Sequence, residues 1–219
     1  MSVKRLTRFV LIMLVTLSVF PVDGKALDID AFIKKASISY EKKFTIDASL
    51  DMWNRILDHP VLMARLWDLY EFKPKYRIYE RGKGFHISDP SGIEGELDVI
   101  LNEPVKRIYY GTGKLKNWHI PVSFKGKALF LVNQTYEGGK VKVTLNIYGE
   151  GGANLVTDLL LKAISPLLTH YINRRITRNL RDLNILIDDI IQRPEKIRSE
   201  IKGRYIYEFD RVIGGTATL

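Results

Sequence analysis

Residues 148–175 read "YGEGGANLVTDLLLKAISPLLTHYINRR", a stretch that leads from a strand-like segment into a long apolar-rich one. An alternating segment ends here, and three glycines between 149 and 152 let the chain turn sharply. Asn154 can then cap a helix, because its side chain can accept a hydrogen bond from a free backbone N–H group. Apolar residues follow at the three- or four-residue spacing of one helical face: Leu160, Ile164, Leu168, Ile172, Ile176, Leu180, Leu183 and Ile187. We expect a long amphipathic helix, kinked or split at Pro166.

The residues just before this helix alternate between apolar and polar, as in a strand that is buried on one face. The apolar set is Val141, Val143, Leu145 and Ile147. Polar residues between them are typical of an antiparallel sheet with one wet face. Other strand-like segments are 37–46, 75–88, 93–101, 105–115 and 123–137. The segment 75–88 turns as a hairpin over residues 81–84, and Leu97 and Leu101 of 93–101 are both expected to face inward. The chain thus predicts about seven strands.

Residues 47–70 interrupt the strands with two short helical patterns. Asp47 or Ser49 can cap the first helix. Pro60 ends it and is tolerated in the first turn of a second helix over residues 61–70. Strands in a run, followed by one long helix, are typical of an α+β fold rather than of an alternating α/β fold. A curved antiparallel sheet has a concave face, which the long helix can cover.

The first 26 residues are predicted to be a secretory signal peptide. A basic start precedes an apolar run from Phe9 to Phe20, and residues 24–26 form a small-x-small cleavage signature. The run is shorter than the roughly 20 residues of a membrane-spanning helix, although an uncleaved membrane anchor is the alternative. Export would place the protein in the periplasm or outside the cell. The chain has no cysteine, so no disulfide and no cysteine metal site is expected.

Charge and composition divide the remaining chain into a domain and a tail. Removing residues 1–26 takes away four basic residues and one acidic residue, which lowers the formal charge from +9 to +6. This excess fits either ordinary solubility or attraction to anionic lipid headgroups. A globular domain is expected over residues 27–191, opening with one or two helical turns. Residues 192–219 are predicted to be a charged tail with one strand-like patch, "RYIYEF", and a disordered end, "GGTATL".

The order of these elements resembles the START-like helix-grip superfamily, also called SRPBCC. This superfamily includes lipid-transfer START domains, the birch-pollen allergen family, coenzyme Q-binding proteins and polyketide cyclase/aromatases. The resemblance covers roughly residues 36–191. It rests on "FTIDASLDMWNRILDHPVLMARLW" after the first strand, on the chain of hairpins, and on the turn "GEGGAN" into the long helix. No short motif is diagnostic of the superfamily, so the match is one of architecture.

The resemblance implies that the long helix lies across the concave sheet, and that a cavity between them holds a ligand. Apolar and aromatic walls suit lipids, sterols, quinones or polyketides, and no cofactor is expected. The inward faces supply candidate wall residues: Trp67, Tyr110, Phe130, Leu145, Leu160, Ile164 and Leu168. Arg174, Arg175 and Arg178 lie on other faces of the helix and are candidates for docking to an anionic membrane surface.

The sequence offers little conventional catalytic chemistry. The four histidines, His59, His86, His119 and His170, do not pair at metal-ligand spacing. His86 lies between Phe85 and Ile87 and is expected to point away from the core. Neither a Gly-x-Ser-x-Gly elbow nor the lysine of a phosphate-binding loop is present. The aromatic residues are spread over strands and helices, which favours core packing or cavity walls over nucleic-acid binding.

Three hypotheses of function follow. The first is a non-enzymatic exported carrier or sensor that encloses an apolar or amphipathic small molecule, in particular a lipid. The second is an enzyme of the cyclase/aromatase type, with a tyrosine or histidine acting as acid or base in the cavity. The third is an interaction module whose cavity has collapsed.

Overall fold

The computed structural model describes residues 27–90, 92–115, 124–151 and 155–214. In the helix Leu155–Gln192 it describes the side chains of Pro166, Thr169, His170 and those from Ile172 onward. The expected signal peptide and His119 lie outside the described residues, as does most of "GGTATL". The helices are α1 (Ile29–Lys35), α2 (Leu50–Asp58), α3 (Pro60–Leu69), α4 (Leu155–Gln192), α5 (Pro194–Glu200) and α6 (Arg204–Ile213). The strands are β1 (Ile38–Ile46), β2 (Arg77–Arg81), β3 (Gly84–Asp89), β4 (Ile93–Asn102), β5 (Lys106–Leu115), β6 (Phe124–Glu137) and β7 (Lys140–Gly151).

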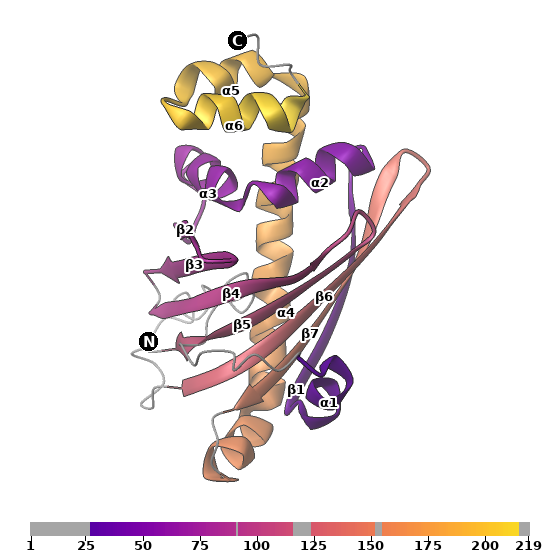
Figure 1. Cartoon of the computed structure of the whole chain (residues 1–219), viewed down its shortest axis with the longest axis vertical. Coiled ribbons are helices and arrows are strands. Elements are labelled where there is room, and N and C mark those ends of the chain that lie inside the picture. Colours follow the sequence, from indigo (N-terminus) through magenta and orange to yellow (C-terminus); the bar gives the residue numbers. More distant parts are fainter. Residues whose placement is uncertain (1–26, 91, 116–123, 152–154, 215–219) are drawn as a thin grey trace.

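The strands form one antiparallel sheet in the order β1-β7-β6-β5-β4-β3-β2. Each strand from β2 to β7 pairs with its neighbour in the chain, and β1 closes the far edge by pairing with β7. The sheet is strongly twisted and bent (Figure 1), which gives it one concave face. The expected inward set on β7 is confirmed, because Val141, Val143, Leu145 and Ile147 are all buried. The expected α+β class and curved sheet are also confirmed.

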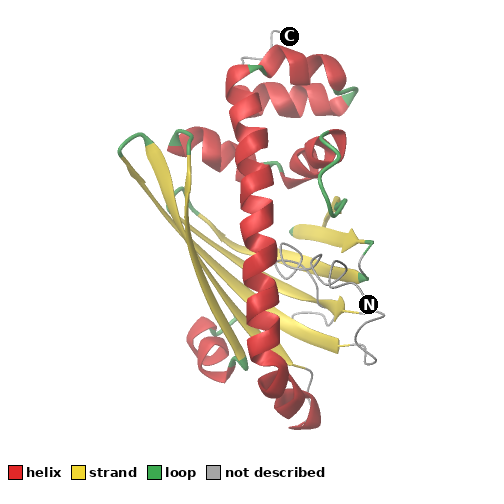
Figure 2. Ribbon diagram, turned by 180° about the vertical axis from the view of Figure 1, so that it is seen from behind, coloured by secondary structure: helices red, strands yellow, loops and turns green. Residues whose placement is uncertain are grey.

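Helix α4 runs along the concave side of the sheet (Figure 2). Ile172 and Ile176 on α4 are almost fully buried and join a core cluster with Tyr40, Phe130 and Ile147 from three strands. This is the helix-grip arrangement, and it confirms the expected place of the long helix. Pro166 lies inside one continuous helix, so of the two expected outcomes, a kink or a split, the split does not occur. The first turns of α4 instead lean away from the axis of the rest (Figures 1 and 2).

A polar contact fixes the edge strand β1 to α4. Lys42, which interrupts the apolar face of β1, reaches the side chains of Asn173 and Thr177 on α4. Tyr40 donates a hydrogen bond of 3.0 Å to the same Asn173. The lysine therefore keeps its place on an inward face because its ammonium group finds oxygen partners on the helix.

The four helices α2, α3, α5 and α6 gather around the C-terminal half of α4, at one end of the sheet (Figure 1). A second core cluster joins them, and within it Phe209 and Val212 of α6 have no exposed surface. The prediction that "RYIYEF" is strand-like is therefore wrong, since these residues open α6. The residues expected to form a charged tail fold, from Pro194 to Ile213, into two helices that pack on the domain.

Helix α1 covers the outward face of the sheet, opposite α4. Its N-terminus is capped by Asp28, and Phe32 packs edge-to-face on Tyr110 with ring centroids 5.9 Å apart.

A β-bulge lies in β4 between Val99 and Leu101. Val99 pairs with Tyr109, whereas Leu101 pairs with Ile108. The extra residue turns Leu101 to the outward face, where it packs in the cluster under α1. The expectation that Leu101 faces inward with Leu97 is therefore wrong.

A buried polar network ties α2 to strands β5 and β6. The indole Nε1 of Trp53 donates a hydrogen bond of 2.8 Å to Oε1 of Gln134. The amide of Gln134 in turn donates to Asn54 and to the backbone oxygen of Pro104. Arg107, only 3% exposed, pairs with Asp58 at 2.6 Å. This network holds the helix pair α2–α3 in place over the end of the sheet.

Candidate functional site

An apolar cavity lies between α2, α3, α4 and the concave face of the sheet. Its volume is about 270 Å³. The lining is almost entirely aliphatic and aromatic: Phe44, Trp53, Ile56, Leu57, Pro60, Met63, Ala64, Trp67, Tyr76, Ile78, Phe85, Ile87, Leu97, Tyr109, Val132, Val143, Leu145, Ile176, Asn179, Leu180 and Leu183. No histidine and no charged side chain occurs among these described residues. The cavity can therefore bind apolar matter by contact, and the titratable side chains in its lining are Tyr76 and Tyr109.

The local sequence explains why these side chains meet. Trp53, Ile56 and Leu57 share one face of α2, and the break at Pro60 turns α3 so that its apolar residues face the sheet. Alternation along β2, β3, β4 and β7 supplies every second residue. On α4, positions 176, 179, 180 and 183 form one helical stripe. The cavity lies where these faces do not quite meet.

Polar atoms of the lining gather at Tyr76, in the segment between α3 and β2. Asn179 donates a hydrogen bond from Nδ2 to the Tyr76 hydroxyl oxygen at 2.9 Å, and Arg175 donates to the same oxygen at 3.1 Å. The ring of Trp67 meets that of Tyr76 at a steep angle, with centroids 5.8 Å apart. Burial raises the pKa of Tyr76 to about 12, although the neighbouring Arg175 acts in the opposite direction. The residue as a whole is only half-buried, but its hydroxyl is enclosed and neutral.

Behind Tyr76 lies a buried ion pair. Arg175 donates from Nη2 to Oδ2 of Asp89 at 3.1 Å, and the guanidinium also lies over the Tyr76 ring, 5.9 Å from its centroid. The pair is closed off from solvent, and Arg175 is not among the residues that line the cavity. It holds Tyr76 in position.

The structure brings together only some of the expected wall residues. Trp67 and Leu145 line the cavity. Phe130 is fully buried on the concave face but packs within the core beside the cavity. The prediction for Tyr110 is wrong, because its side chain lies on the outward face of the sheet and packs under α1. Its neighbours on β5, Tyr109 and Gly111, face inward instead. The side chains of the remaining candidates, Leu160, Ile164 and Leu168, lie outside those that the structure describes.

The expected basic docking surface on α4 is not formed as predicted. Arg175 is 2% exposed and points inward to Asp89, so it cannot contact a membrane. Arg178 is half-exposed and lies 3.8 Å from Asp182, whereas Arg174 is exposed. Within the described residues, no helix is long and apolar enough to cross a bilayer.

The three histidines that the structure describes do not line the cavity. His86 points to the outward face, as expected, but it is covered: its Nδ1 lies 2.8 Å from Oε1 of Glu96, and Tyr79 stacks on its ring with centroids 4.6 Å apart. His59 ends α2, and His170 is exposed on α4. The described residues include no group of three or more histidine or acidic side chains placed to hold a metal ion.

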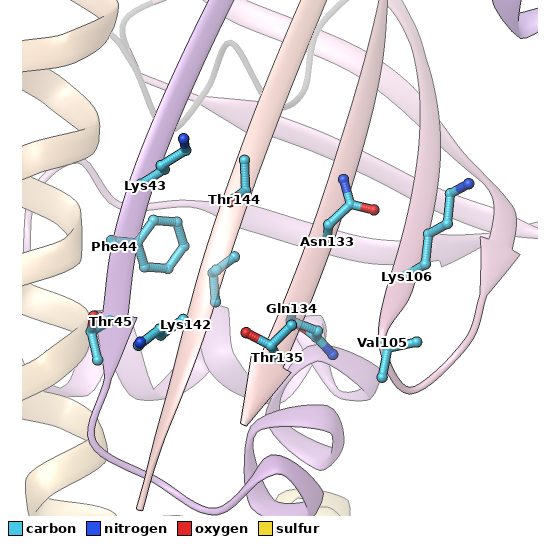
Figure 3. Close-up of a pocket in the computed structure, with 11 residues that line it drawn as sticks. Lys43, Phe44, Thr45, Val105, Lys106, Asn133, Gln134, Thr135, Lys142 and Thr144 are labelled. Carbon is cyan, nitrogen blue, oxygen red and sulfur yellow. The ribbon is translucent and has the colours of Figure 1, made fainter. Parts of the chain in front are cut away.

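A second, larger hollow of about 670 Å³ lies on the outward face of β1, β7 and β6, near the start of β5 (Figure 3). It is polar, with Lys43, Lys106 and Lys142 among threonine and asparagine side chains. Two of these lysines pair with nearby carboxylates, Lys43 with Glu41 and Lys142 with Glu137. The hollow is open to solvent, and its charges are largely compensated, so it is a weaker candidate than the apolar cavity.

Of this lining only Trp67 and Leu145 were named as wall residues from the sequence, and the residues that were missed include Tyr76 and Asn179, which form a polar contact. Asn179 carries a readable signal, because it is the polar member of the helical stripe that contains Ile176, Leu180 and Leu183. Tyr76 carries none, since it lies in the segment that precedes β2 and nothing in its neighbourhood points to α4.

No protein-family model matches the sequence, and no curated protein matches it. Several solved structures align with the chain at low identity. A protein from Arthrobacter aurescens is 13% identical with a TM-score of 0.47, covering 77% of this chain and 92% of its own. The Zhui aromatase/cyclase from Streptomyces sp. R1128 is 13% identical with a TM-score of 0.46, covering 71% and 96%. Ara h 8.0201 is 10% identical with a TM-score of 0.39, covering 63% and 93%. These likenesses concern the fold alone.

Proposed function

We propose that this protein binds a small apolar or amphipathic molecule in the cavity between α4 and the sheet. The observation that carries the proposal is the lining: aliphatic and aromatic side chains border a half-open hollow of about 270 Å³, and none of these described residues is charged. Close packing is the norm in protein interiors, so a hollow of this size beneath a covering helix needs a reason. An apolar ligand supplies one, because it restores the missing contacts.

The size of the cavity limits how much of a ligand it can hold. At about 30 Å³ for each water molecule in the liquid, the cavity holds the equivalent of roughly nine waters, and hence about as many non-hydrogen atoms of a ligand. Micromolar binding of such a molecule corresponds to about 8 kcal/mol, or roughly 0.9 kcal/mol per atom. That lies below the ceiling for very small ligands, so a dissociation constant in the micromolar range is attainable.

The mechanism of this function is enclosure. The ligand gives up its contact with water, and each square ångström of apolar area removed from water contributes about 25 cal/mol. No acid or base is needed for this step, and the described lining contains neither a carboxylate nor an imidazole. An open cavity also speaks against the alternative of an interaction module with a collapsed interior.

The test is a titration of the purified full chain with 1-octanol and with n-nonane, followed by tryptophan emission and by calorimetry. Two of the three tryptophans, Trp53 and Trp67, line the cavity, so binding should change the emission. Ala64→Phe places a ring in the space that Ala64 borders on α3 and should abolish binding. Ala31→Phe, on α1 at the outward face, is the matched control and should bind as the wild type does.

Absence of binding by either compound, or equal binding by wild type and Ala64→Phe, would overturn the proposal. Organic extraction of the purified protein, followed by mass spectrometry, would identify a ligand carried over from the cell. If the extracted ligand or a related compound were chemically altered on incubation with the protein, that result would indicate an enzyme of the cyclase type instead.

We further propose that the ligand is a single-chain lipid or a related molecule, of which about nine non-hydrogen atoms lie in the cavity, and that the protein acts after export. The basic start, the apolar run from Phe9 to Phe20 and the small residues at 24–26 support export. The intact mass of the protein recovered from its native cells tests this proposal. A mass that begins at Leu27 agrees with it, and a mass that includes residue 1 contradicts it.

A further inference from the structure

A row of basic side chains runs along β2, the edge strand at the end of the sheet opposite β1. Between residues 73 and 83 the only acidic residue is Glu80, whereas five residues are cationic: Lys73, Lys75, Arg77, Arg81 and Lys83. All five are exposed except Lys75, which is half-buried. Tyr79 lies in the middle of the row and has half of its surface exposed. The five cations and Tyr79 are called the basic strip below.

Alternation along β2 separates the basic strip from the cavity. Tyr76 and Ile78 line the cavity. Arg77 and Tyr79 alternate with them and therefore face the other way. Tyr79 stacks on the ring of His86, which lies on the outward face of the sheet, with ring centroids 4.6 Å apart. The same short segment thus builds part of the cavity wall on one side and presents cations to solvent on the other.

The described part of the protein neutralises only some of this charge. Lys75 and Arg81 each pair with a carboxylate at 2.5 Å. Arg77 and Lys83 form no ion pair with any residue in the described ranges, and both are exposed. Two full positive charges therefore remain on the strip for a partner.

The nearest acidic side chains on the outward face belong to β4, and they do not cancel the strip. Glu94 pairs with Lys114 at 2.8 Å, and Glu96 pairs with Arg81. Asp98 is half-buried. Two of these three carboxylates are thus already bound to cations, and the strip stays basic toward solvent.

The geometry of the strip favours an extended anionic surface over a small anion or an added strand. Helix α3 lies beside β2 at this edge of the sheet (Figure 1), so a partner meets side chains rather than free backbone groups. Arg77 and Arg81 are four residues apart in a strand, which is about 13 Å, so one small anion cannot contact both. Charged edge strands also discourage pairing with other chains, but α3 already covers this edge.

We propose that the basic strip docks the protein on an anionic phospholipid surface. Each lysine or arginine near such a surface strengthens binding by about fivefold. The exposed tyrosine among the cations suits the boundary between lipid and water, where tyrosine is enriched. The proposal goes beyond the proposed function and does not depend on it. It also replaces the helix surface that was expected from the sequence, in which Arg175 is buried.

The experiment measures flotation of the purified full chain with two kinds of vesicle. One kind is pure phosphatidylcholine, and the other contains equal parts of phosphatidylcholine and phosphatidylglycerol. The readout is the ratio of the two partition coefficients, because an apolar segment such as Phe9–Phe20 binds both kinds. The wild type should prefer the anionic vesicles at about 0.1 M NaCl. At about 1 M NaCl, where the screening length falls to about 3 Å, the ratio should approach one.

The double variant Arg77→Gln/Lys83→Gln removes the two unpaired cations of the strip. It should lower the ratio by about 25-fold, which is about fivefold for each charge. Arg174→Gln/Lys202→Gln is the matched control, because it removes two exposed cations elsewhere that form no ion pair within the described ranges. The control should stay within about twofold of the wild type. Circular dichroism should show both variants folded, since all four positions are exposed.

Three results would overturn the proposal. The first is a wild type that binds both kinds of vesicle equally, or neither. The second is an equal loss in the two double variants, which would mean that only net charge matters. The third is binding of a polyglutamate peptide, lost in Arg77→Gln/Lys83→Gln, without binding of anionic vesicles, which would assign the strip to an acidic protein partner.

A further variant separates the docking proposal from the cavity. Ala64→Phe fills the cavity and leaves the basic strip unchanged, so its vesicle ratio should stay within about twofold of the wild type. Normal vesicle binding without binding of 1-octanol or n-nonane would remove the proposed function alone. Normal binding of these compounds without a preference for anionic vesicles would remove the docking proposal alone.

Discussion

Asp89 on β3 and Arg175 on α4 form an ion pair of 3.1 Å in which neither side chain has more than 2% of its surface exposed. The two residues lie 86 positions apart in the chain. The pair joins the covering helix to the sheet beside the cavity, and it places the tyrosine that marks the polar end of that cavity.

The first prediction concerns this ion pair. Arg175→Met keeps the apolar stem but leaves the carboxylate of Asp89 buried without its guanidinium, which should cost about 3–5 kcal/mol in the free energy of unfolding. Urea denaturation followed by circular dichroism measures the loss. Arg174→Met, at the exposed neighbouring position on the same helix, is the control and should stay within about 0.5 kcal/mol of wild type. Equal stabilities for both variants would contradict the structural role of the pair.

The second prediction tests whether the C-terminal helices belong to the domain. Phe209 on α6 is fully buried against the helices around the end of α4, so Phe209→Ala should cost about 3–5 kcal/mol. Tyr207, two residues earlier, is 67% exposed, and Tyr207→Ala should change stability by less than about 0.5 kcal/mol. Thermal melting of both variants decides the matter. A Phe209→Ala protein as stable as wild type would show that α6 contributes nothing to the core.

Much of the architecture could be predicted because burial repeats with a fixed period. The alternation of Val141, Val143 and Leu145 can only be a strand with one covered face, and the stripe through Ile172 and Ile176 can only be a helix with one covered side. A curved sheet followed by a long amphipathic helix leaves few arrangements. The sequence therefore predicted the fold class, the sheet and the covering helix.

The C-terminal segment shows where periodicity is ambiguous. Over six residues, "RYIYEF" fits a strand, because the aromatic residues Tyr205, Tyr207 and Phe209 recur at every second position. The buried residues Phe209 and Val212 extend the pattern with helical spacing. A window of ten residues would have favoured the helix, so this error arose from the length of the segment considered.

The polar residues around Tyr76 could not be predicted from the sequence for a different reason. Arg175 lies among several arginines on α4, and a charged residue on a helix is most often solvated. What buries it is Asp89, which comes from another part of the chain and has no sequence relation to it. Pairs of this kind depend on tertiary contact, which single-sequence patterns do not encode.

The third prediction concerns the close approach of β3 and β4. A Cβ atom on Gly84 would lie 2.0 Å from the backbone oxygen of Leu97, so Gly84→Ala must push the two strands apart. We expect a loss of about 1–3 kcal/mol, as in other overpacked sites. Gly149→Ala is the control, because its Cβ would meet Ile38 at an ordinary 3.5 Å, and it should be neutral or slightly stabilising. Equal losses in the two variants would mean that strand glycines matter here only through their flexibility.

The fourth prediction is a decline of stability at alkaline pH. Burial raises the pKa values of Tyr76 and Tyr110 to about 12, and it raises the pKa of Tyr70 as well. In the unfolded chain a phenol ionises near pH 10. Below about pH 10 both states hold the proton, so stability does not depend on these groups. Between about pH 10 and 12 the unfolded state loses the proton while the folded state keeps it, so the free energy of unfolding falls as pH rises.

Each unit of pKa difference is worth about 1.4 kcal/mol, so the decline is steep enough to follow by urea denaturation at a series of pH values. Tyr76→Phe and Tyr110→Phe should each make the slope shallower, even where they lower stability at neutral pH. Tyr207→Phe, which removes an exposed phenol, is the control and should keep the wild-type slope. Identical slopes in all four proteins would contradict the burial of the Tyr76 hydroxyl between Arg175 and Asn179, on which the polar end of the cavity depends.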